Sequence, residues 1–226
     1  MIEVIVIGEG QTEETFVRDV LAPAFGAHDI FLHARLISTS KRGRGGALSG
    51  DRVLSFLRKT LRERGDTYVT TLFDLYGLRP DFPGISQVAA GGDPIAHCEA
   101  IEAAFAAMVV ADSGCRADRF LAYIQPYEFE ALLFADVSQF AALQSEWSRF
   151  VPALQAARDG ADSPEHINDG PQTHPSARLE QVLKPRYDKP LHGSRLAERI
   201  GIGRMRSECQ HFDAWLARIE ALPPFV

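Results

Sequence analysis

The strongest constraint on the fold is an alternation of short apolar segments with amphipathic segments over the first 136 residues. The apolar segments have the length and composition of buried strands, and they cover residues 2–7, 30–37, 68–75 and 120–124. Segments with a helical spacing of apolar side chains cover residues 12–24, 51–64, 94–111 and 126–136. This alternation predicts an α/β fold with a mainly parallel sheet flanked by helices.

The pattern changes after Val137, where helical segments and loops replace the strands. Residues 193–222 have the pattern of two helices, and the second carries Phe212, Trp215 and Ile219 on one face. We therefore predict two parts, an α/β core at residues 1–136 and a helical C-terminal extension at residues 137–226 that packs on the core.

Composition and cysteine usage indicate an ordinary globular protein of the cytoplasm. Hydrophobic residues make up 46% of the chain and charged residues 24%. The first residues show neither a basic segment nor a small-residue cleavage site, and no uncharged apolar run approaches the length of a membrane span. Cys98, Cys115 and Cys209 are widely spaced and odd in number, which disfavours a disulfide framework or a zinc site. We expect a cytoplasmic protein with no membrane partner.

Two acidic residues stand where predicted strands end. Glu9 lies between Gly8 and Gly10 directly after the first strand, and Asp74 lies at the end of the third. Ligands of parallel sheets bind outside the carboxyl ends of the strands. If these strands are neighbours, a spacing of about 4.8 Å brings the two carboxylates close enough to share a divalent cation such as Mg²⁺. The alternative is that both are helix-capping or solvated loop carboxylates.

The residues around Glu9 resemble a known family. "VIGEGQTEETF" is similar to the first motif of Toprim domains, the metal-binding fold of primases, topoisomerases and OLD-type nucleases, and its Thr-Glu pair resembles the OLD-type version. Further segments, "TLFDLYGLRPDFPG", "IQPYEFEALLFAD", "NDGPQTHPSARL" and "YDKPLHG", resemble a Toprim-like bacterial family of unknown function. Members of that family are often encoded beside an ATPase in defence-type gene neighbourhoods.

The resemblance assigns roles to individual acids. It implies that Glu9 is the Toprim glutamate, Asp74 the first aspartate of the Asp-x-Asp motif and Glu13 the additional acid of OLD-like members. The chain departs from the motif at Tyr76, which stands at the second aspartate position. A replacement carboxylate is therefore expected, with Glu128 and Glu130 as first candidates and Asp81 as a further one. The predicted ligands of Mg²⁺ or Mn²⁺ are Glu9, Glu13, Asp74, Glu128 and Glu130, and the predicted catalytic residues are Glu9, Asp74 and Glu128.

Local basic residues are the candidates for nucleic-acid binding, because the formal net charge of −6 provides no general attraction to phosphates. Lys41, Arg42 and Arg44 lie in the glycine-rich segment "SKRGRGG", and Arg178 and Lys189 lie in the C-terminal half. The alternatives are a solvated loop for the first three residues and ordinary surface salt bridges for the other two.

Two functions of different kinds follow from these residues. The first is a Mg²⁺- or Mn²⁺-dependent nuclease that cleaves DNA or RNA phosphodiesters in a phage-defence system with an ATPase partner. The second is a non-catalytic or conditionally active regulatory partner of an ATPase, which the missing second aspartate favours. A nucleotide-binding enzyme ranks last, since neither GxGxxG nor GxxxxGK[ST] is present. A homodimer is left open.

Overall fold

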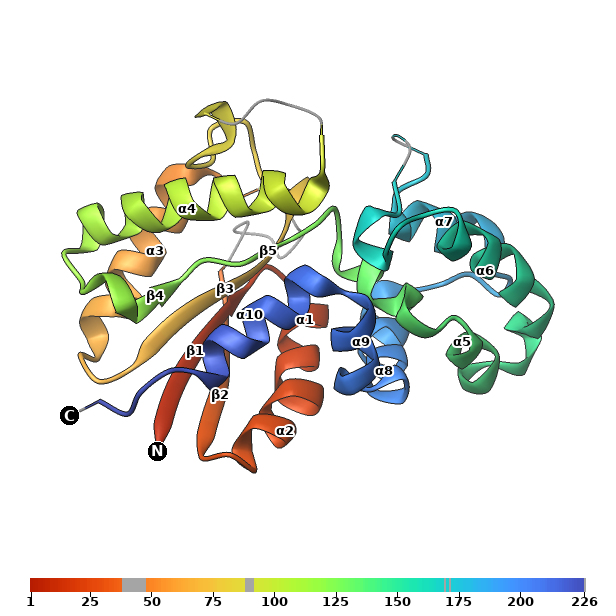
Figure 1. Ribbon diagram of the computed structural model, residues 1–226, viewed down its shortest axis with the longest axis horizontal. Helices are drawn as coiled ribbons and strands as arrows, with labels where there is room; N and C mark the ends of the chain where they lie inside the picture. Colours follow the sequence, from red (N-terminus) through yellow and green to blue (C-terminus); the bar gives the residue numbers. More distant parts are fainter. Residues whose placement is uncertain (38–47, 88–91, 169, 171, 226) are drawn as a thin grey trace.

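A five-stranded parallel sheet forms the centre of the protein (Figure 1). The structure is a computed structural model, and it describes residues 1–37, 48–87, 92–168, 170 and 172–225 of the 226-residue chain. The strands are β1 (Ile2–Gly8), β2 (Ile30–Leu36), β3 (Tyr68–Asp74), β4 (Phe120–Leu121) and β5 (Ile124–Gln125). Their order is β2-β1-β3-β4, and β5 pairs with β3 beyond β4. The predicted α/β class with a mainly parallel sheet is confirmed.

The central strands β1 and β3 are buried on both faces, which explains why they are almost continuously apolar. In β1, Val4 and Val6 belong to one core cluster, whereas Ile5 belongs to the other. In β3, Leu72 belongs to the same core cluster as Val4, and Phe73 belongs to the same cluster as Ile5. Successive side chains of a strand point to opposite faces, so one apolar run supplies both cores.

Helices cover the two faces in separate layers (Figure 1). The core on one face includes side chains of α3 (Gly50–Glu63) and α4 (Pro94–Ser113). The other core includes side chains of α1 (Gln11–Phe16), a π-helical turn (Val17–Leu21), α2 (Ala22–Gly26) and α10 (Gln210–Glu220). The N-terminal and C-terminal segments therefore share one face of the sheet.

The C-terminal helices are tied to the strands and to α1. Trp215 of α10 stacks on Tyr123 with ring centroids 4.3 Å apart, and its indole N–H donates to the Thr70 hydroxyl at 2.8 Å. The remaining helices are α5 (Ser138–Leu143), α6 (Val151–Asp159), α7 (Pro175–Val182), α8 (Lys189–Ile200) and α9 (Ile202–Glu208). Helix α8 lies against α1. The boundary between residues 136 and 137 stays a prediction.

The structure differs from the predicted elements in three places. The predicted strand at residues 120–124 is divided into β4 and β5, because the Thr71 hydroxyl bonds both the N–H and the C=O of Tyr123 at 2.9 Å. The helix predicted from residue 126 is a 3₁₀ segment (Phe129–Asp136). The two helices predicted within residues 193–222 are three, since α8 ends at Gly201, whose φ of +79° is unfavourable for other residues.

One described helix, α4, has the length and apolar composition of a membrane span. A core helix of a soluble protein passes the same test. Cys98, Ile101 and Phe105 of α4 are fully buried within the core that the helix shares with α3 and the sheet. One face of α4 therefore packs into this core, and 33% of its apolar window is buried.

Candidate functional site

The ends of β1 and β3 bring Glu9 and Asp74 together. The two strands are parallel neighbours, with Gly8 opposite Leu72, so the residues that follow them meet at one edge of the sheet. The backbone N–H of Asp74 donates to Glu9 Oε1 at 3.2 Å. The side-chain oxygen Oδ1 of Asp74 accepts the backbone N–H of Phe129 at 2.7 Å. The two strand-end acids are thus held by direct backbone contacts.

Glycines let the backbone approach this pair closely. A Cβ on Gly8 would lie 2.9 Å from Glu13 Cβ, so glycine is what allows the start of α1 to fold back over the end of β1. A Cβ on Gly77 would lie 2.7 Å from both carboxylate oxygens of Glu9. Sequence reasoning missed Gly77, and its position three residues after Asp74 was the available signal.

The centre of the acidic site is occupied by an ammonium group of the chain itself. Lys189 Nζ lies 2.9 Å from Asp74 Oδ2, 3.2 Å from Glu130 Oε2 and 3.4 Å from Glu13 Oε1. Glu13 and Glu130 are buried, and the Asp74 side chain is 15% exposed. Four predicted metal ligands, Glu9, Glu13, Asp74 and Glu130, therefore belong to one acidic cluster, and Lys189, predicted to bind nucleic acid, lies within it.

The cluster concentrates charge in a partly buried place. Burial, reinforced by the Asp74 and Glu13 carboxylates, raises the pKa of Glu9 to about 8. Burial raises the pKa of Asp74 to about 6 and that of Glu130 to about 7, although Lys189 opposes both changes. Burial would lower the pKa of Lys189, but the surrounding carboxylates raise it well above its ordinary value. Lys189 is therefore a permanent cation, whereas the acids are reluctant to ionise.

Glu128 makes its hydrogen bonds on another side of the site. Its Oε2 accepts the backbone N–H of Ser176 at 3.0 Å and contacts His174 Nδ1 at 2.9 Å, while Oε1 accepts the Ser176 hydroxyl at 3.0 Å. These contacts lie at the N-terminal end of α7, where a negative charge is favourable. Glu128 remains close enough to raise the pKa values of Asp74 and Glu130 slightly.

Tyr76 points away from the acidic cluster. Its side chain is 47% exposed, and its ring lies 5.5 Å from that of Tyr127 and 5.7 Å from that of His174. The side-chain amide of Asn168 donates to its hydroxyl. Position 76, where the resemblance led us to expect an aspartate, is thus occupied by a tyrosine in an aromatic group beside α7.

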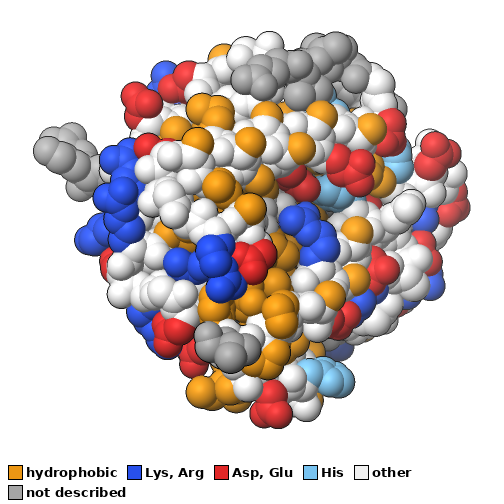
Figure 2. All heavy atoms as spheres, turned by 60° about the vertical axis from the view of Figure 1, so that its left-hand side comes forward, with side chains coloured by type: hydrophobic (Ala, Val, Ile, Leu, Met, Phe, Trp, Pro, Cys, Tyr) orange, Lys and Arg blue, Asp and Glu red, His pale blue; other side chains and the backbone are white. Residues whose placement is uncertain are grey.

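Of the predicted nucleic-acid residues that the structure describes, Lys189 lies within the acidic cluster and Arg178 lies on α7. Lys41, Arg42 and Arg44 lie outside the described residues. Arg178 donates through Nε to the carbonyl of Thr173 at 2.6 Å. Figure 2 shows Lys and Arg side chains gathered along the left-hand edge of that view.

The donor set is compatible with a hard divalent cation, although no ready-made site is present. Among the described residues, no group of three or more His, Cys, Asp or Glu side chains is arranged to hold a metal ion. Carboxylates are nevertheless the ligands that Mg²⁺ and Mn²⁺ prefer. Glu130 Oε2 is buried without a hydrogen bond and faces only the Lys189 ammonium. The residue types fit such an ion, with Lys189 taking the central position.

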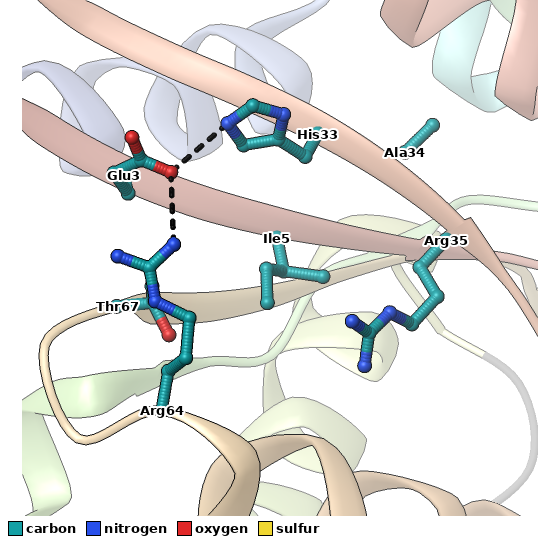
Figure 3. Close-up of a pocket in the computed structure, with 7 residues that line it drawn as sticks. All are labelled: Glu3, Ile5, His33, Ala34, Arg35, Arg64 and Thr67. Atoms are coloured by element: carbon teal, nitrogen blue, oxygen red, sulfur yellow. Dashed lines mark ion pairs between the residues drawn. The ribbon is translucent and has the colours of Figure 1, made fainter.

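A separate hollow lies toward the amino ends of the strands, far along β1 from Glu9 (Figure 3). It has a volume of about 300 Å³ and is lined by Glu3, Ile5, His33, Ala34, Arg35, Arg64 and Thr67. The Glu3 carboxylate lies 3.0 Å from His33 Nε2 and 3.5 Å from Arg64 Nη1, whereas Arg35 pairs with Glu63 at 2.6 Å. Because its guanidinium groups are already paired with acids, this hollow is not a ready anion site.

A comparison of the sequence with known protein families finds one family that covers most of the chain. A family model described as a domain of unknown function (DUF4276) matches residues 8–220. No curated protein matches the chain. No solved structure matches it either.

Proposed function

The chain belongs to the DUF4276 family, and from this premise we propose that it is a Toprim-like, Mg²⁺- or Mn²⁺-dependent nuclease that cleaves DNA or RNA phosphodiesters. We further propose that it acts in phage defence with an ATPase encoded nearby. The observation that carries the proposal is the convergence of Glu9, Glu13, Asp74 and Glu130 at the carboxyl edge of the sheet.

The acids have complementary roles in this proposal. Glu9, Glu13 and Asp74 would hold the ion, which when bound stabilises charge on a phosphate oxygen and makes a water a better nucleophile. Glu9 is a ligand or a general base, and its pKa of about 8 suits a group that exchanges protons near neutral pH. Glu128 would act through the N-terminal end of α7, where it positions His174 and Ser176 beside the site.

A basic face of α3 supports a nucleic-acid substrate. Lys59 and Arg62 are exposed, and within the described part of the chain neither forms an ion pair. They line a hollow of about 450 Å³ together with Ser55, Arg58 and the acidic Glu63. Helix α3 follows the segment with Lys41, Arg42 and Arg44 in the sequence, which we propose as a further phosphate contact.

The proposal is tested by metal-dependent cleavage. Supercoiled plasmid and structured RNA are incubated with Mn²⁺ and the wild-type chain, with and without the neighbouring ATPase and ATP. Glu9→Gln should abolish cleavage, because it removes a charged ligand while keeping a hydrogen-bond acceptor. Glu14→Gln, the same substitution at an acid of α1 outside the cluster, should leave cleavage intact. Absence of any cleavage with partner, ATP and Mn²⁺ present would refute the nuclease.

One observation favours a second function. Lys189 already compensates part of the acidic charge, and Tyr76 supplies none of the charge of the second aspartate. A site of this kind suits a non-catalytic or conditionally active regulatory partner of an ATPase. In that case the ATPase should be captured by wild type and by Glu9→Gln equally, and neither protein should cleave nucleic acid.

A further inference from the structure

Lys189 has the surroundings of a bound cation. Its ammonium contacts Asp74, Glu130 and Glu13, three acids that come from separate parts of the chain. Among the described residues, no other cation contacts three carboxylates, and Arg206, for example, contacts two. The side chain as a whole is 32% exposed.

The position of Lys189 at the start of α8 is electrostatically unfavourable. Lys189 is the first residue of α8, and the N-terminal end of a helix carries a partial positive charge that disfavours a cation. Asp188 caps the helix by accepting the backbone N–H of Leu191 at 3.0 Å. The three carboxylates offset this unfavourable position, which indicates that the lysine serves the acidic cluster rather than α8.

Close packing fixes the ammonium where it is. A Cβ on Gly193 would lie 3.0 Å from Thr12 Cγ2, 3.2 Å from the Tyr187 hydroxyl and 3.3 Å from a Phe129 ring carbon. Glycine at this position therefore lets α8 lie directly on α1. The Lys189 ammonium is also 5.8 Å from the centre of the Phe129 ring, within the range of a cation–π contact.

The charge of the cluster is only partly compensated. Three carboxylates contact the ammonium, and Glu9 is the fourth acid of the cluster, which forms no ion pair among the described residues. With all four acids ionised, the four carboxylates and one ammonium have a charge of −3, which one divalent ion changes to −1 and a second would reverse to +1. Without the ammonium of Lys189, two divalent ions would balance the four carboxylates. The acid without an ion pair is Glu9, so a single ion is expected on its side.

We propose that Lys189 takes the place of one cation in this cluster, so that the chain binds a single divalent ion on the Glu9 side instead of a pair. The inference rests on the proposed metal-dependent function and specifies how many ions that function uses. Lys189 acts as a positioning residue that holds three acids together before any ion arrives.

The test counts bound ions directly. Titration calorimetry with Mn²⁺, supported by electron paramagnetic resonance of free Mn²⁺, should give one ion per wild-type chain. Lys189→Met removes the ammonium and keeps much of the side-chain length, and it should bind two ions. Lys189→Arg keeps the charge and should bind one, as should Lys184→Met, a matched change at an exposed lysine outside the cluster.

Thermal melting in a chelator provides a second readout. Lys189→Met should melt at a lower temperature than wild type without metal and recover with Mn²⁺, whereas Lys184→Met should behave as wild type. Two ions in the wild type, or one ion in Lys189→Met with unchanged affinity, would overturn the inference while leaving the nuclease in place. No ion in either protein would overturn both. If Lys189→Met does not fold, the number of Mn²⁺ ions bound by the wild-type chain still tests the inference.

Discussion

Replacing Glu9 by glutamine should stabilise the metal-free protein near neutral pH. Burial and the neighbouring carboxylates raise the pKa of Glu9 from 4.5 to about 8 in the folded protein. A carboxyl with a raised folded-state pKa contributes stability that is fully present below pH 4.5 and is lost as the pH rises through 8. Ionised Glu9 therefore destabilises the fold at pH 7, and glutamine imitates its protonated form.

The size of the effect follows from these two pKa values. Their difference of about 3.5 lowers the free energy of unfolding by about 5 kcal/mol above pH 8, because one pKa unit corresponds to about 1.36 kcal/mol. The free energy of unfolding is lowered by about 3 kcal/mol at pH 7 and by less than about 1 kcal/mol at pH 5. The gain from Glu9→Gln should therefore grow with pH between 5 and 8. Glutamine can keep the hydrogen bond from the backbone N–H of Asp74.

Urea unfolding in EDTA at pH 5, 7 and 8 measures this gain, with Glu14→Gln as the control for removing a charge from the same segment. Mg²⁺ should reverse the order. At a concentration of about 1,000 times its dissociation constant, it adds about 4.1 kcal/mol to the wild type alone, which exceeds the advantage of about 3 kcal/mol for Glu9→Gln at pH 7. A Glu9→Gln protein that is less stable than wild type at pH 7 in EDTA, or a difference that does not depend on pH, would refute the reasoning.

Three further outcomes are expected. Gly77→Ala should displace the Glu9 carboxylate and weaken Mn²⁺ binding by about tenfold, which corresponds to about 1.4 kcal/mol. Gly65→Ala is the control, because its added methyl group would lie in open space, and the Mn²⁺ affinity measured by titration calorimetry should not change. Glu165→Gln should lower the free energy of unfolding by about 1–3 kcal/mol in urea, because the buried carboxylate accepts two backbone N–H groups at the start of α10. Replacing Lys59 and Arg62 by glutamine should reduce the log–log salt slope of nucleic-acid binding by up to about two, and an unchanged slope would exclude this face.

The strand-end acids could be predicted from the sequence because two simple regularities act together. Apolar runs fix where the strands end, and parallel strands place their carboxyl ends at one edge. Glu9 and Asp74 needed nothing more, whereas Glu13 came only from the resemblance of its segment to the OLD-type Toprim motif. The predicted sheet was correct except where the Thr71 side chain interrupts the ladder at Tyr123, a long-range contact without a local signal.

The role of Lys189 could not be predicted in the same way. It lies 115 residues after Asp74 in the chain, and their contact depends on how α8 packs on α1. A lysine at the start of a helix reads locally as a solvated residue. For Glu128 the local pattern was incomplete in another way. Its position after a strand suggested a metal ligand, whereas in the structure its carboxylate contacts Ser176 and His174.

Tyr76 and Lys189 both affect the net charge of the acidic cluster. An aspartate at position 76 would add a further negative charge close to Asp74, and it would raise the cost of assembling the cluster without metal. The tyrosine adds no such charge, and its ring packs with Tyr127 and His174 outside the cluster. The same cluster contains an internal ammonium that contacts three of the remaining acids. One fewer acid and one more fixed cation change the charge balance in the same direction, toward fewer bound ions. Under the proposed function, the tyrosine at the expected second aspartate position is therefore not by itself a sign of lost catalysis, because in our proposal Lys189 takes the place of one of the cations.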